Sequence, residues 1–359
     1  MTGAWRYLPP LAIAVFAIGV GLVVAVSGDT FGYDFSAYWL AGRRLLDGQP
    51  LYDASVSQAV GFGVWLYPPP AAAAFIPFAL LAQDLATATW IALMGAATVA
   101  GIAISPVSAR TRWLVLLLAG VMWPVAYAIK LGQVTPLLFL GFAITWRWLE
   151  RPAAVGAVGG LCGVLKLQPG LVLGWALLTG RWRAVVIGAG VAAGAVLLAL
   201  PLTGLDSYAD YLALLGRVSG AVDTPNNMAP GAIARQLGVD AGAAGILQLG
   251  AMAAALALAV VAARRGFPEA GFLAAIVVSQ VASPVLWTHY AVVLLLPIAW
   301  LLERRQWWAV AIPLAMSIPL VGVTPGVVYP LAFGAVLVAL VAPGVGARQT
   351  HTVRARASG

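Results

Sequence analysis

Long apolar runs, separated by short segments that carry most of the charge, extend along almost the whole chain. A helix that crosses the hydrocarbon core of a membrane needs about 20 such residues, with a range of about 17–25. The run over 153–180 exceeds this range and is interrupted at Lys166, Gln168 and Pro169, so we divide it into two short segments. The pattern predicts twelve transmembrane helices, over residues 8–26, 85–104, 113–129, 132–147, 153–166, 168–180, 184–202, 241–263, 267–283, 288–302, 307–321 and 327–342.

The composition also indicates an all-α, polytopic integral membrane protein. Hydrophobic residues make up 62% of the 359 residues, charged residues only 9%, and the mean hydropathy is +0.95. Soluble proteins carry roughly 25% charged residues, so a soluble enzyme is excluded. The pI near 10 could indicate a nucleic-acid partner, but the basic residues occur in scattered pairs and form no basic stripe. We therefore expect no nucleic-acid partner.

The distribution of charge predicts which side each loop faces. The apolar run 69–82 is short and contains Pro77. If it does not cross the membrane and the N-terminus is inside, the inner side receives 14 of the 20 basic residues and only 3 of the 12 acidic ones. The net charge is then +11 inside and −3 outside. The positive-inside rule favours this arrangement, so 69–82 is predicted to be a short helix at the outer interface.

This topology gives one transmembrane domain over residues 1–342 and a cytoplasmic tail over 343–359. The inner loops are short, whereas the outer side has two long loops, 27–84 and 203–240. We therefore expect function at the outer face of a cell membrane, with membrane lipids around the helices. The single cysteine, Cys162, lies in an apolar run and is predicted to be a small buried residue.

Uncommon polar residues occur at one depth of the predicted bundle, near the outer helix ends. They are Lys130, Gln133, Lys166, Gln168, Asn226, Asn227 and His289. A single polar layer favours an active site at the interface, because a solute pathway would place polar groups through the full depth. A polytopic transporter or lipid flippase is the main alternative, and a non-catalytic assembly subunit is another. A transporter would need broken helices in repeat-related positions, and only the break at 165–170 qualifies.

The first outer loop contains an acidic residue with two possible roles. Asp34 precedes a predicted interfacial helix over 36–47, whose apolar positions include Trp39, and Gly48 ends that helix. Asp34 is either the N-cap of this helix or a general base near the membrane surface. Arg43 faces either lipid headgroups or a substrate phosphate.

Four further segments carry candidate site residues. They are YPPP at 67–70, KLGQVTP at 130–136, LKLQPG at 165–170 and SPVLWTHY at 283–290. Prolines suit a first helical turn, and a lone lysine at a helix end commonly snorkels to the interface. Lys166 lies at a helix break, where a lysine can pair with a phosphate. His289 adds a titratable ring that an aromatic belt does not need.

Taken in order, the segments YDFSAYWLAGRRLLDGQPLYD, YPPP, KLGQVTPLLFL, LKLQP and SPVLWTHYAVVLLLP resemble the polyprenyl-phosphate-mannose-dependent α-mannosyltransferases, glycosyltransferase family 87 of the GT-C superfamily. The resemblance spans roughly residues 30–300. It implies a GT-C-like fold and transfer of a lipid-linked sugar on the outer face, with an aspartate of the first outer loop as base. Asp34 matches that position. The family commonly has two histidines or an aromatic-rich string in the last motif, whereas this chain has only His289.

The expected activity is an inverting transfer of a sugar, most simply mannose, from a polyprenyl-phosphate donor to a lipid or glycan acceptor. The sequence has no GxxxxGK[ST] loop and no DxD pair, so we expect no nucleotide, cofactor or metal site. Asp34 is expected to be the base, and a positively charged side chain is expected to neutralise the leaving phosphate. The candidates for that charge are Lys166, Arg43 and Lys130, and those for substrate binding are His289, Gln133, Tyr67, Trp39 and Asn227.

Overall fold

A computed structural model describes residues 3–53, 55–56, 61–218, 224, 226–265 and 267–342. The predicted tail over 343–359 lies outside the described residues. Within them, all regular elements are helices, as predicted. The first half contains η1 (Gly3–Tyr7), α1 (Leu8–Ala25), η2 (Gly28–Thr30), α2 (Tyr33–Leu46), α3 (Pro69–Ala73), α4 (Ile76–Ala79), α5 (Gln83–Ile104), α6 (Ala109–Val121), α7 (Trp123–Leu131), α8 (Thr135–Arg147) and α9 (Pro152–Leu165). The second half contains η3 (Gln168–Gly170), α10 (Leu171–Leu178), α11 (Trp182–Thr203), α12 (Asp206–Val218), α13 (Pro230–Gln236), α14 (Ala241–Arg264), α15 (Pro268–Val281), η4 (Thr288–Leu294), α16 (Leu295–Glu303), η5 (Trp307–Val310), α17 (Ala311–Ala315), η6 (Ile318–Leu320) and α18 (Val328–Val341).

Four helical segments in the described part of the chain are long and apolar enough to cross a membrane on their own. They are Trp5–Ala25, Gln83–Ile104, Trp182–Thr203 and Ala241–Arg264. A fifth is possible if α7 and α8, which meet at an angle of 116°, form one bent span. Shorter apolar helices, such as α9, α15 and α18, fill most of the remaining predicted ranges. The chain is therefore a helical membrane protein, whereas the number of twelve crossings stays a prediction.

Two predicted spans are broken where they touch each other. The predicted helix over 113–129 is divided into α6 and α7 at Met122, whose backbone is extended, with φ −78° and ψ 113°. Pro124 lies in the first turn of α7, where its missing amide hydrogen leaves no helical bond unmade, so it favours the start of a new helix there. The Trp123 amide instead donates to the Met316 carbonyl at 2.8 Å, within the second broken span, 307–321.

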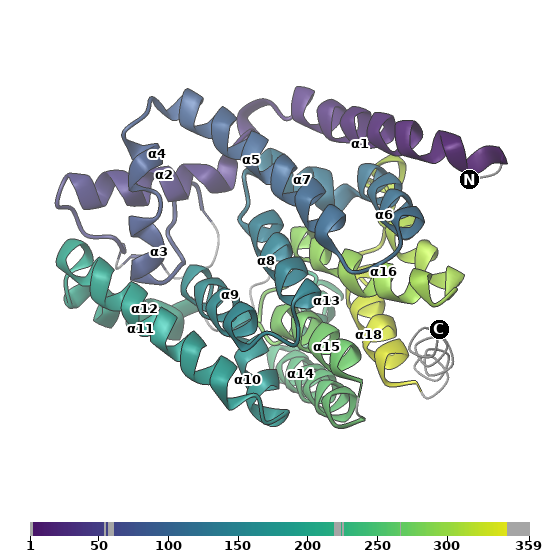
Figure 1. Cartoon of the computed structure of the whole chain (residues 1–359). Coiled ribbons are helices and arrows are strands. Elements are labelled where there is room, and N and C mark those ends of the chain that lie inside the picture. The colour runs from purple at the N-terminus through teal and green to yellow at the C-terminus, as the bar shows by residue number, and fades with distance from the viewer. Residues whose placement is uncertain are drawn as a thin grey trace.

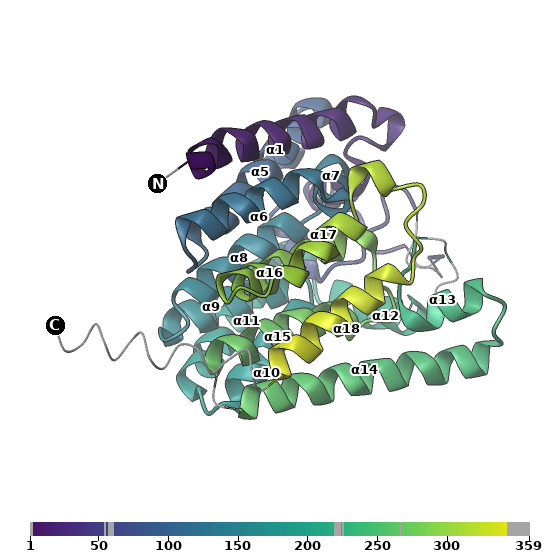
Figure 2. The ribbon, with the colours of Figure 1, turned by 90° about the vertical axis from the view of Figure 1, so that its right-hand side faces the viewer.

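The run 69–82 forms two short helices, α3 and α4, instead of the single short helix that we predicted. Their five and four residues reach about 14 Å at 1.5 Å per residue, which is less than a hydrocarbon core of about 30 Å. They lie beside α2 and α12 in one region of the molecule, away from α16 and α18 (Figure 1). Figure 2 shows α1 along one side of the bundle and α14 along the opposite side.

Charged side chains join the loops at one end of the helices. Glu303 accepts hydrogen bonds from the Ser108 amide at 3.1 Å and from the Ser108 hydroxyl at 2.8 Å. Arg181 pairs with Glu150 at 3.1 Å, and Arg304 pairs with Glu269 at 3.0 Å. All of these loops were assigned to the inner side by charge, so this end carries the predicted inner loops. The polar residues of the candidate site gather at the other helix ends.

Small residues bring α9 and α11 into close contact, and this contact fixes the position of Lys166 at the end of α9. A Cβ atom added to Gly156 would lie 2.4 Å from the Ala184 carbonyl oxygen, and one added to Gly160 would lie 2.5 Å from that of Gly188. Such small-xxx-small pairs let two membrane helices approach at the backbone.

We expect Gly160→Ala to lower the free energy of unfolding by about 1–3 kcal/mol, because the added methyl group must push two backbones apart. Gly190→Ala is the matched control, since a Cβ atom there meets nothing within 4 Å. Thermal unfolding of both variants in the same detergent measures the difference. Equal stabilities would show that the two helices are not packed through Gly160.

Candidate active site

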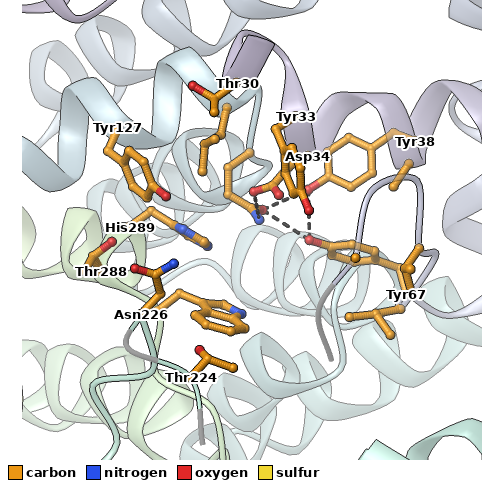
Figure 3. A pocket seen from close by; sticks show the side chains of 17 residues that line it. Thr30, Tyr33, Asp34, Tyr38, Tyr67, Tyr127, Thr224, Asn226, Thr288 and His289 are labelled. Carbon is orange, nitrogen blue, oxygen red and sulfur yellow. Dashed lines mark hydrogen bonds between the residues drawn. The ribbon is translucent and has the colours of Figure 1, made fainter. Parts of the chain in front are cut away.

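A cavity of about 500 Å³ lies where α2, α7, the segment before α8 and the start of η4 converge (Figure 3). Polar and aromatic side chains from distant parts of the sequence line it. They include Thr30, Tyr33, Asp34, Tyr38, Tyr67, Tyr127, Gln133, Thr224, Asn226, Trp287, Thr288 and His289. Phenol and indole rings with hydroxyl and amide groups are suited to contact a sugar. The cavity therefore has the chemistry of a carbohydrate site.

Asp34 is positioned by the start of α2, which begins at Tyr33 and not at residue 36 as predicted. The N-cap position is Gly32, whose φ of 68° suits a residue without a Cβ atom. Asp34 lies in the first turn of α2 and is not its N-cap residue, which argues against the cap interpretation. Its Oδ2 atom instead accepts a hydrogen bond from Gln133 Nε2 at 2.9 Å.

The environment of Asp34 suits a base that works near neutral pH. The helix α2 belongs to the first outer loop in the predicted topology. Burial raises the pKa of the Asp34 carboxyl group to about 6, although the Gln133 hydrogen bond and the charge of Lys166 both lower it. A carboxylate with this pKa is mostly ionised at pH 7 and is a stronger proton acceptor than an ordinary aspartate.

Lys166 lines a second cavity of about 260 Å³ that adjoins the first. The two cavities share Leu66, Tyr67, Gln133 and Trp287 in their linings. Lys166 follows the end of α9 in an extended conformation, and its ammonium group lies 3.9 Å from the centroid of the Tyr290 ring. None of the ion pairs in the described part of the chain involves Lys166. The lysine charge is therefore available to a ligand.

The second cavity also has an apolar side. Leu215 and Val218 of α12 line it, together with Val285. Gln168 and Ser283, which are joined by a hydrogen bond of 3.1 Å, add polar groups on the side of Lys166. An amphiphilic ligand with an anionic group fits this lining.

His289 is buried, with 4% of its surface exposed, and it borders the larger cavity. Neither ring nitrogen has a hydrogen-bond partner among the described residues. Its ring centroid lies 6.4 Å from that of Tyr127 and 5.0 Å from that of Tyr290. Because buried polar groups are nearly always satisfied, these two nitrogens are suited to bind a polar group of a ligand in the cavity.

Four of the predicted site residues line neither of these two cavities. Trp39 donates to the Leu81 carbonyl at 3.2 Å, and Arg43 forms an ion pair with Asp47 at 3.1 Å on the surface of α2. Lys130 donates to the hydroxyl group of Thr30, which itself lines the larger cavity. Asn227 is fully buried.

The Asn227 side chain joins the second outer loop to the segment before η4. Its Oδ1 atom accepts from the amides of Ala229 at 3.0 Å and Leu286 at 2.9 Å, and its Nδ2 atom donates to the Pro284 carbonyl at 3.2 Å. These bonds favour a structural role for Asn227. The neighbouring Asn226 lines the cavity instead.

Sequence reasoning did not assign a role to Tyr33, Tyr127, Thr224 or Thr288, although each of them lines the larger cavity. Tyrosines near predicted helix ends look like ordinary interfacial anchors. Only the folded chain shows that they line one cavity together with Asp34.

Comparisons with known proteins agree with this site. The sequence model of glycosyltransferase family 87 matches residues 65–286. A polyprenol-phosphate-mannose-dependent alpha-(1-2)-phosphatidylinositol mannoside mannosyltransferase of Mycolicibacterium smegmatis is 31% identical, over 88% of this chain and 80% of the relative. A protein of Mycobacterium tuberculosis with the same description is 29% identical, over 79% of this chain and 73% of that relative. No solved structure matches the chain.

A second Mycolicibacterium smegmatis protein is described as a polyprenol-phosphate-mannose-dependent alpha-(1-2)-phosphatidylinositol pentamannoside mannosyltransferase. It is 30% identical, over 84% of this chain and 72% of the relative. The apolar helices, the cavities and these relatives define a membrane-bound glycosyltransferase, which argues against the transporter, flippase and assembly-subunit alternatives. The chain belongs to glycosyltransferase family 87.

Proposed function

We propose that the enzyme transfers mannose from a polyprenyl-phosphate donor to the glycan of a lipid acceptor, at the outer face of the cell membrane and with inversion. The observation that carries this proposal is the meeting of Asp34, Lys166 and His289, from three distant segments, at two adjoining cavities. The donor and the class of acceptor, a phosphatidylinositol mannoside, follow from the descriptions of the relatives. The charge distribution supports an active site outside.

In the proposed reaction, an acceptor hydroxyl oxygen attacks the anomeric carbon of the donor. The bond between that carbon and the phosphate oxygen breaks, and polyprenyl phosphate leaves. Asp34 takes the proton of the attacking hydroxyl group. Asp34 is the only carboxylate that lines either cavity in the described part of the chain. One carboxylate suffices for an inverting displacement, whereas a retaining enzyme commonly needs a second.

The two cavities suit the two substrates. Lys166 would neutralise the leaving phosphate, and Leu215 and Val218 would contact the start of the polyprenyl chain. The larger cavity, with its hydroxyl and aromatic lining, would hold the acceptor sugar beside Asp34. The transferred mannose would then lie near Tyr67 and Gln133, which line both cavities. The unsatisfied His289 ring would bind a hydroxyl or phosphate oxygen.

A transfer assay in proteoliposomes tests this function. The purified protein would be offered polyprenyl-phospho-mannose, polyprenyl-phospho-glucose or a nucleotide mannose, each with phosphatidylinositol mannosides and with a glycopeptide acceptor. We expect product only from polyprenyl-phospho-mannose and the mannolipids. Product formed from the nucleotide mannose, in the absence of a polyprenyl-phosphate donor, would contradict the proposal.

The rate should depend on the ionisation of Asp34. Only the carboxylate form can accept a proton, and burial raises the pKa of Asp34 to about 6. We therefore expect kcat/KM to fall about tenfold per pH unit below about pH 6. A pH–rate profile of the wild type measures this. An acid limb centred near pH 4 would show an ordinary, solvated aspartate.

A further inference from the structure

Gln133 lies in the sharp turn between α7 and α8. Gly132 ends α7 with a φ of 67°, a conformation that favours glycine, and a Cβ atom there would lie 2.7 Å from that of Phe35 on α2. This close approach holds the turn against the first turns of α2. Only 4% of the surface of Gln133 is exposed, and the residue lines both cavities.

Three donors fix which way the Gln133 amide faces. Its Oε1 atom accepts hydrogen bonds from the Val134 backbone amide at 2.8 Å, from the Tyr38 hydroxyl at 2.9 Å and from the Tyr67 hydroxyl at 3.2 Å. A backbone N–H can only donate, so the amide atom that faces Val134 must be the oxygen. The opposite orientation would place two N–H groups against each other.

With the oxygen fixed, the Nε2 group must point at Asp34, where it donates to Oδ2 at 2.9 Å. Among the described residues, Gln133 is the only hydrogen-bond partner of the Asp34 side chain. Oδ1 is therefore left for the substrate. A donor held in this way stabilises the ionised carboxylate and sets its rotation, since a hydrogen bond to the charged form favours that form.

We propose that Gln133 is a positioning residue that holds the Asp34 carboxylate ionised and rotated toward the acceptor hydroxyl, with its amide orientation fixed by Val134, Tyr38 and Tyr67. This inference rests on the proposed role of Asp34 as the base. It differs from the sequence prediction, which placed Gln133 among the substrate-binding residues. Gln133 acts on the reaction through Asp34.

Other titratable groups also face Asp34 from the elements around it. They are Tyr33 and Tyr38 of α2, Tyr67 of the first outer loop, Tyr127 of α7, Lys166 after α9, and His289 and Tyr290 of η4. Phenols ordinarily titrate near pH 10 and stay neutral in the assay range. Lys166 and His289 are unchanged in the variants below, so a change in the acid limb reports on the Gln133 contact.

Gln133→Met keeps the length of the side chain and removes the donor. We expect the acid limb of kcat/KM to move up by about one pH unit and kcat to fall about 10- to 100-fold, with KM values for donor and acceptor unchanged. Tyr38→Phe removes one of the three donors to Oε1 and should move the limb in the same direction by less. If Gln133→Met fails to fold, Tyr38→Phe tests the inference in its place.

Gln248→Met is the matched control, because Gln248 is also buried and hydrogen-bonded but touches neither cavity. Its acid limb should stay in place. The inference is overturned if Gln133→Met raises KM while kcat and the acid limb stay unchanged, which is the result for a substrate-binding residue. If Asp34→Asn keeps the wild-type acid limb, the base assignment itself fails. If Asp34→Asn removes the limb but Gln133→Met leaves it in place, only the present inference fails.

Discussion

Asp34→Asn is expected to lower the rate of mannose transfer by about 10²- to 10⁴-fold, because asparagine cannot take the proton of the acceptor hydroxyl. Its side-chain oxygen can still accept the hydrogen bond from Gln133, which Asp34 now accepts at 2.9 Å. Asp34 is not the N-cap residue of α2, so this helix should keep its N-terminus. Turnover and donor affinity measured in one membrane preparation test this expectation.

Donor affinity should stay near that of the wild type, because Asp34 acts on the acceptor hydroxyl. The folded state of the variant is checked by its thermal unfolding in detergent. If the folded Asp34→Asn protein keeps more than about a tenth of the wild-type turnover, Asp34 is not the base, since the weakest general bases contribute roughly 10²-fold.

Lys166→Met should weaken donor binding by about 10- to 100-fold, since a hydrogen bond between charged groups contributes about 1.5–3 kcal/mol. The contact to the phosphate exists before the reaction, so affinity falls together with kcat/KM, in contrast to Asp34→Asn. Titration with a non-reactive polyprenyl phosphate measures the affinity. The methionine keeps the apolar contact with the Tyr290 ring, which lies 3.9 Å from the lysine nitrogen.

Arg43→Gln is the control for the loss of one positive charge. Arg43 pairs with Asp47 on the surface of α2 and lines neither cavity, so donor affinity should not change. An equal loss of affinity in both variants would indicate a general effect of charge on anionic lipids and would remove Lys166 from the phosphate site.

The apolar pattern predicted the positions of the longest helices well. The prediction 85–104 corresponds to α5, 184–202 to α11 and 241–263 to α14, with ends that differ by at most two residues. Each of these helices is long and apolar enough to cross a membrane on its own, and the local sequence shows this property directly. The break at Met122 was missed, because its hydrogen-bond partner, the segment at Met316 and Ser317, lies far along the chain.

The candidate site was only partly predictable. Asp34 was selected because its segment in the first outer loop resembles that of the family, and Lys166 because it lies at a helix break, and the two residues line adjoining cavities. We predicted Asn227 as a substrate-binding residue, whereas Asn226 lines the cavity, because an irregular loop has no periodicity that says which side chain faces the cavity. The orientation of the Gln133 amide depends on Tyr38 and Tyr67, which only the folded chain brings together.

The stereochemistry of transfer tests the account most directly. The wild-type enzyme in proteoliposomes would receive polyprenyl-phospho-β-mannose and a phosphatidylinositol mannoside, and the product would be analysed by NMR for the configuration at the new anomeric carbon. A base that activates the acceptor hydroxyl predicts an α-mannoside, formed with one equivalent of polyprenyl phosphate. A β-mannoside, or a mannose covalently attached to Asp34, would contradict it.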